Sequence, residues 1–84
     1  MSLEEGELGL LSCNVQAFPR AQLHWFRRLG ELESEQVEPG GRFAQVANLL
    51  LIRRLHRNDS GAYLCRAKNS AGEQRLELEL RVRG

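Results

Sequence analysis

The stretch from Asp59 to Cys65 constrains the fold of this chain more than any other part of the sequence. An aspartate, a glycine and a tyrosine lead at every second position into Cys65. Side chains two positions apart share one face of an extended strand, so Tyr63 and Cys65 are expected on the same face of one strand. The other cysteine, Cys13, lies far upstream, and the only tryptophan, Trp25, lies between the two cysteines.

Alternating apolar residues predict several further strands. The clearest case is the last segment, where apolar residues alternate with arginines and glutamates over eight positions. The apolar groups with this period are Leu11, Cys13, Val15 and Ala17; Leu23 and Trp25; Leu50 and Ile52; Tyr63, Cys65 and Ala67; and Leu76, Leu78, Leu80 and Val82. The period outweighs the composition, because 15 leucines with one isoleucine and no threonine would favour helix by propensity alone. Many short strands between turn signals predict an all-β sandwich.

Size and charge narrow the function classes. The 84 residues suffice for one small domain, and residues 1–84 are interpreted as a single module taken from a longer multidomain protein. The formal net charge of +1 gives no general attraction to nucleic acid. No apolar run approaches the ~18 residues of a membrane span, so direct membrane insertion is not expected. Because the sequence has no nucleophile–base pair, phosphate loop or metal-ligand spacing, we expect no enzyme, cofactor or metal.

The two cysteines, the intervening tryptophan and the pattern of residues 59–65 together resemble an immunoglobulin-fold module, most closely of the I-set (intermediate) type. The resemblance runs from about residue 3 to residue 82. It implies a two-sheet Greek-key sandwich in which an A/A′-B-E-D sheet packs on a C′-C-F-G sheet. The strands are expected near residues 8–17 (B), 22–28 (C), 30–32 (C′), 42–46 (D), 49–54 (E), 61–69 (F) and 73–82 (G), with only a stub, residues 3–5, for strand A.

The resemblance also implies roles for core residues. Cys13 and Cys65 occupy the positions of the inter-sheet disulfide, which would close a loop of about 50 residues and contribute roughly 3–4 kcal/mol. A reactive or metal-binding thiol pair is the alternative, and intracellular I-set modules often keep these cysteines reduced. Trp25 would pack on the bridge, and Tyr63 would hydrogen-bond to the backbone at the E–F corner. Leu50 and Ile52 complete the predicted core.

Arg42 and Asp59 are expected to form a second structural pair. In similar domains an arginine at the start of strand D reaches this aspartate, and the geometry suits a bidentate ion pair. A catalytic role for Asp59 is the weaker alternative, since it is the only aspartate. Asn58-Asp59-Ser60 matches the N-glycosylation pattern, which makes Asn58 a candidate acceptor. Residues 69–72 suit a tight F–G turn that ends in a glycine with positive φ.

Two features depart from the family pattern. Gly9 stands where similar domains place a large inward apolar residue, so a gap in the core is expected. If Leu11, Leu50 and Ile52 point inward, their neighbours point outward and form an exposed apolar patch on the A-B-E-D sheet, which consists of Leu8, Leu10, Leu49 and Leu51. Two interpretations remain open: a register slip at Gly9 that turns some leucines inward, or an interface with a second copy or a neighbouring module.

Arginine supplies 11 of the 12 basic residues. Some of them gather near the ends of the predicted strands C and E, at Arg27-Arg28 and Arg53-Arg54, with His56 and Arg57 close behind. Since successive strand residues face opposite sides, these pairs do not automatically form one patch. A site for a sulfated polysaccharide or an acidic partner is one interpretation, and a solvated surface is the other.

Two functions follow from the resemblance. The first is a non-catalytic recognition or adhesion module in a cell-surface receptor, located outside the cell in a tandem array beside immunoglobulin or fibronectin-type modules. Its partner would be a protein that the sequence does not name, or a second copy bound through the A-B-E-D face. The second is an intracellular docking module of a muscle or cytoskeletal scaffold. Because both use the same fold, the fold alone does not separate them.

Overall fold

The computed structural model describes residues 2–13 and 22–84, which form two β-sheets and one short 3₁₀ turn. The five-stranded sheet has the order β1-β8-β7-β3-β4 and the three-stranded sheet the order β2-β6-β5. Their bounds are β1 Ser2–Glu4, β2 Gly9–Ser12, β3 Gln22–Arg28, β4 Ser34–Gln36, β5 Phe43–Val46, β6 Leu49–Ile52, β7 Gly61–Asn69 and β8 Gly72–Arg83, with the turn η1 at Arg57–Asp59. The described residues contain no helix long and apolar enough to cross a membrane.

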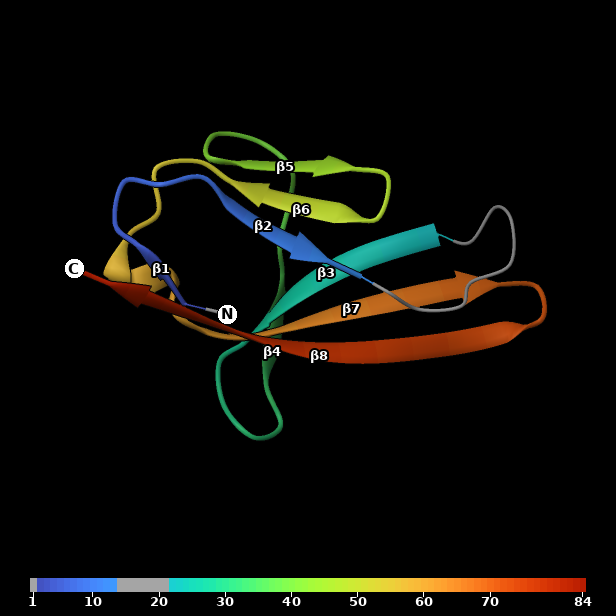
Figure 1. Cartoon of the computed structure of the whole chain (residues 1–84). Helices are drawn as coiled ribbons and strands as arrows, with labels where there is room; N and C mark the ends of the chain where they lie inside the picture. Colours follow the sequence, from blue (N-terminus) through green and yellow to red (C-terminus); the bar gives the residue numbers. More distant parts are fainter. Residues whose placement is uncertain (1, 14–21) are drawn as a thin grey trace.

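The two sheets lie face to face as layers of a sandwich, with the three-stranded sheet above the five-stranded one in Figure 1. Between them lie the buried side chains of Leu11, Cys13, Trp25, Leu50, Ile52, Leu55, Tyr63, Cys65, Leu80 and Val82. The predicted period-two pattern is visible in β6, where Leu50 and Ile52 are buried and Leu49 and Leu51 are not fully buried. The all-β immunoglobulin sandwich predicted from the sequence is confirmed.

Several strand bounds differ from the predictions. The strand expected at residues 30–32 is β4, which lies at Ser34–Gln36. The strand expected at residues 49–54 ends at Ile52, because Arg54 has a φ of 50° and breaks the extended backbone. The strand expected at residues 8–17 is β2, which covers Gly9–Ser12, and Val15 and Ala17 lie outside the described residues. The predicted strand at residues 61–69 matches β7.

The first strand lies in the other sheet from the one expected. Residues 3–5 were predicted to border strand B, but β1 pairs in parallel with the end of β8, with Leu3 opposite Val82. At Gly6 the chain crosses from the five-stranded sheet to the three-stranded sheet, and the φ of 87° at this position favours glycine. The Gly6 N–H then donates to the Leu55 carbonyl at 2.8 Å. As a result, β1 covers the edge of β8, and the described part of the sheet that contains β2 has three strands.

Candidate functional site

A disulfide joins the two sheets at the centre of the core. Cys13 follows β2, Cys65 lies in β7, and their sulfur atoms are bonded, with the Cα atoms 6.1 Å apart. Trp25 lies directly opposite Cys65 in the β3–β7 pairing, and both side chains are fully buried. The cysteines are therefore placed as the resemblance implied. The described residues contain no group of three or more metal-ligating side chains.

Tyr63 closes the corner before β7. Its hydroxyl donates to the Asp59 carbonyl at 2.6 Å, and burial raises the pKa of this phenol above its ordinary value. The guanidinium of Arg27 lies 5.8 Å from the ring centroid of Tyr63 and donates to the carbonyl of Ser60 at 3.2 Å. Each of these contacts ties η1 and the start of β7 to the rest of the sandwich.

Asp59 is the one buried charged residue of the described chain, with 2% of its surface exposed. The Arg42 guanidinium donates two hydrogen bonds to the Asp59 carboxylate, of 2.8 and 3.0 Å, and the backbone N–H of His56 donates a third, of 2.8 Å. Burial raises the pKa of Asp59, but the hydrogen bonds from Arg42 and His56 and the charges of Arg42 and Arg27 outweigh it, so the pKa lies below its ordinary value of 3.8. This arrangement keeps the Asp59 carboxylate ionised, and its oxygens already accept three hydrogen bonds from the protein. Such a carboxylate suits a structural role.

His56 caps the 3₁₀ turn, a role that the sequence did not suggest. Its Nδ1 accepts from the Asn58 N–H at 3.3 Å, while the Asp59 carboxylate accepts from the His56 N–H. Serine, threonine, asparagine and aspartate are the usual residues at this position. A histidine therefore gives no recognisable capping signal in the sequence.

Asn58 lies on the surface of η1, and its glycosylation remains a prediction. Its backbone carbonyl accepts from the guanidinium of Arg27. Ser60, the third residue of the glycosylation pattern, accepts from the Val82 N–H at 2.9 Å through its hydroxyl. In the folded module this serine therefore helps to hold β8.

The outward side of the three-stranded sheet is apolar. Leu10 lies opposite Leu51, and Leu51 lies opposite Ala44 on the next strand. The pairing runs without interruption from Gly9 to Ser12, so these residues contain no slip of the kind considered above. Leu8, Leu10 and Val46 are 51%, 43% and 56% exposed. We call this surface the leucine face and define it as Leu8, Leu10, Ala44, Val46, Leu49 and Leu51; the sequence did not suggest Ala44 and Val46, because the pairing of β5 with β6 brings them there.

The gap expected at Gly9 is filled. A Cβ at Gly9 would lie 2.9 Å from Cδ2 of Leu55, a residue that is 2% exposed. The positive φ of Arg54 turns Leu55 into the core, although the alternation of β6 would send position 54 inward. The side chain of Leu55 therefore occupies the space that a side chain at position 9 would have filled. The expectation of an unfilled gap at Gly9 was wrong.

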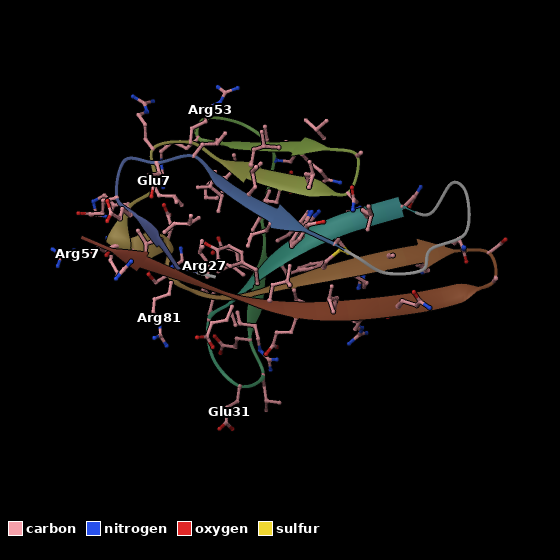
Figure 2. All side chains as sticks on the ribbon, in the orientation of Figure 1. Glu7, Arg27, Glu31, Arg53, Arg57 and Arg81 are labelled. Carbon is pink, nitrogen blue, oxygen red and sulfur yellow. A yellow bond between two sulfur atoms is a disulfide. The ribbon has the colours of Figure 1, made fainter. Side chains whose placement is uncertain are left out.

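The arginines do not form one patch. Arg27 packs on Tyr63, whereas Arg28 pairs with Glu77 on the outward side of the five-stranded sheet. Arg57 lies 3.8 Å from Glu5. Figure 2 shows Arg53 above the three-stranded sheet and Arg57 on η1, at different places on the molecule. This spread favours a solvated surface over a polysaccharide site.

Comparisons with known proteins agree with this architecture. The sequence matches the immunoglobulin I-set domain over residues 1–82. It is 34% identical to neural cell adhesion molecule 1 of Bos taurus over 92% of this chain, and it is 31% identical to smooth-muscle myosin light chain kinase of Gallus gallus over 98%. The four N-terminal immunoglobulin domains of Dscam1 isoform 6.9 include a stretch that is 30% identical, with a TM-score of 0.90 over 98% of this chain.

The chain spans only 9% of the first of these relatives, 4% of the second and 21% of the Dscam1 structure. The likeness therefore concerns one module within much longer proteins. The match to the domain, the disulfide across the sandwich and the corner tyrosine agree on a single assignment. The chain belongs to the immunoglobulin I-set domain family.

Proposed function

We propose that this chain is a non-catalytic recognition module of a cell-surface adhesion protein, one of several modules in tandem. The observation that carries the proposal is the leucine face, since soluble domains seldom expose a continuous apolar surface without using it for contact. The adhesion proteins among the relatives support the same class of function. The partner of the leucine face would be an apolar surface on another protein module.

Adhesion between cells that display the full parent protein tests this proposal. The variant Leu10→Ser with Leu51→Ser should reduce adhesion, because two hydroxyls replace the centre of the leucine face. Leu29→Ser is the matched control, since Leu29 is 58% exposed and lies outside that face. Equal adhesion by all three proteins at equal surface levels would contradict the proposal.

The cellular compartment is proposed to be extracellular. The adhesion molecules among the relatives support this compartment, in which a Cys13–Cys65 disulfide would persist, because cytosolic thiols are normally kept reduced. The relative that is a smooth-muscle kinase favours a second candidate, an intracellular docking module. A free-thiol count on protein from its native source separates the two. Linked Cys13 and Cys65 support the adhesion module, and two free thiols in a folded domain support the intracellular one.

A further inference from the structure

The outward side of the five-stranded sheet carries charged side chains in rows across its strands. Trp25 and Cys65 point into the core, so their neighbours along β3 and β7 point outward. The pairing aligns these neighbours with residues of β8 in three rows, which are Gln22, Lys68 and Glu73; His24, Arg66 and Arg75; and Phe26, Leu64 and Glu77. Beyond these rows Ala62 lies opposite Glu79, and Arg28 pairs with Glu77. We call this surface the charged face.

The two ends of the charged face carry opposite charge. Toward the β7–β8 hairpin, Arg66, Lys68 and Arg75 stand against one acid, Glu73. The opposite end carries five acids, Glu4, Glu31, Glu33, Glu77 and Glu79, and three arginines, Arg28, Arg81 and Arg83. Figure 2 shows Glu31 and Arg81 on this side of the molecule, away from Arg53. We call the two ends the basic end and the acidic end.

Apolar groups lie between the two ends. Phe26 and Leu64 are half-buried and directly opposite each other. The guanidinium of Arg66 lies 5.1 Å from the Phe26 ring centroid. Beside them lies a hollow where Arg75 of the basic end meets the β3–β4 loop, and Leu32 at the tip of that loop is 99% exposed. The hollow is lined by Arg28, Glu31, Leu32, Glu33, Ser34, Leu64 and Arg75. The face therefore has an aromatic centre, a projecting leucine and an adjoining hollow.

A surface with this charge pattern complements itself. A two-fold axis that runs across the strands and parallel to the sheet would turn a second copy end for end. The basic end of each copy would then lie on the acidic end of the other, and the two Phe26–Leu64 centres would meet in between. A polyanion would be repelled by the acidic end, whereas a second copy satisfies both ends. We propose that the charged face binds a second copy of this chain.

The size of the face predicts a weak, salt-sensitive dimer. Nine residues of β7 span about 30 Å and four strands about 15–20 Å, so the flat area is on the order of 500 Å². A stable interface needs about 800 Å² per partner. This proposal rests on the proposed recognition function and names one partner for it, but it uses the face opposite the leucine face. The two proposals can therefore fail separately.

Sedimentation equilibrium of the full chain tests the proposal by charge exchange. The wild type should show a mass that rises with concentration toward that of two chains in about 0.05 M NaCl, and the mass of one chain in about 1 M NaCl, where the screening length is ~3 Å. Lys68→Glu with Arg75→Glu, and separately Glu31→Lys with Glu33→Lys, should each weaken association by about tenfold or more through like-charge contact. An equal mixture of the two variants should restore the dimer.

The control variant for Lys68→Glu with Arg75→Glu is Arg53→Glu with Arg57→Glu, which makes the same change in net charge away from the charged face. It should associate like the wild type, and circular dichroism should show every variant folded. A wild type that stays monomeric at about 1 mM would overturn the proposal, and so would a mixture that fails to associate. A dimer that survives about 1 M NaCl and is lost in Leu10→Ser with Leu51→Ser would also overturn it, while supporting contact through the leucine face.

Discussion

At the scale of single residues, the Arg42–Asp59 ion pair makes the clearest contribution to the stability of the fold. Asp59 is almost completely buried and accepts three hydrogen bonds, two of them from Arg42. Removing one partner leaves a buried charge without its counter-ion. Such a pair therefore stabilises the fold mainly through the cost of breaking it.

Arg42→Ala should lower the free energy of unfolding by about 3 kcal/mol, the low end for a buried pair, because the arginine side chain is partly exposed. Urea unfolding at neutral pH measures the effect. Arg81→Ala is the matched control, since the Arg81–Glu79 pair lies on the surface, and it should cost no more than about 1 kcal/mol. Equal losses in the two variants would contradict the assigned role of Asp59.

The lowered pKa of Asp59 also predicts how stability depends on pH. Because the pKa is lower in the folded state than in the unfolded state, ionised Asp59 stabilises the fold above the ordinary value of 3.8. This stabilisation is lost as the pH falls below that value and through the lowered pKa. The melting temperature of the wild type should therefore fall more steeply below about pH 4 than that of Asp59→Asn. Parallel curves for the two proteins would show that another group governs acid unfolding.

At the scale of elements, the β5–β6 hairpin contains a strained residue. Val46 pairs with Leu49, which leaves Ala47 and Asn48 as a two-residue loop, and Ala47 has a φ of 52°. Such loops normally place glycine at a position with positive φ. Ala47→Gly should raise the free energy of unfolding by about 0.5–1 kcal/mol, because relief of strain exceeds the added chain entropy. Ala44→Gly, within β5, is the control and should lower it by about 0.5–1 kcal/mol. Destabilisation by both substitutions would argue against strain at Ala47.

A second prediction at this scale concerns the contact between Gly9 in β2 and Leu55, which follows β6. Gly9→Ala should destabilise the fold by about 1–3 kcal/mol, because the new methyl group would overlap Leu55. Leu55→Ala should cost about 2–5 kcal/mol through the cavity that it leaves. The double variant should cost less than the sum, since the methyl of one fills part of the space vacated by the other. Strict additivity in a double-mutant cycle would mean that the two residues do not share this space.

At the scale of the whole molecule, the disulfide connects the two layers of a small sandwich. It spans 52 positions of the sequence, which corresponds to about 4 kcal/mol in the chain-entropy description. Cys13→Ala with Cys65→Ala should therefore lower the free energy of unfolding by about 4 kcal/mol or more, measured by urea unfolding without reductant. A loss below about 1 kcal/mol would show that packing around Trp25 holds the layers together without the bond.

The sequence by itself determined the fold class, the β7 strand, the two cysteines, the corner tyrosine and the Arg42–Asp59 pair. The period-two pattern recorded the sandwich and β7, because burial of one strand face dictates residue type directly. The roles of the two cysteines, the corner tyrosine and the Arg42–Asp59 pair followed from the resemblance to I-set modules. The outward direction of Leu10 and Leu51 followed from the same period.

Only the tertiary structure decided where separate segments meet. The pairing of β1 with β8, the filling of Gly9 by Leu55 and the joining of Val46 to the leucine face depend on contacts between residues far apart in the chain. The separation of charge on the charged face likewise appears only after β3, β7 and β8 are aligned. A local pattern reports whether a side chain is buried, but the register between strands decides which side chains become neighbours.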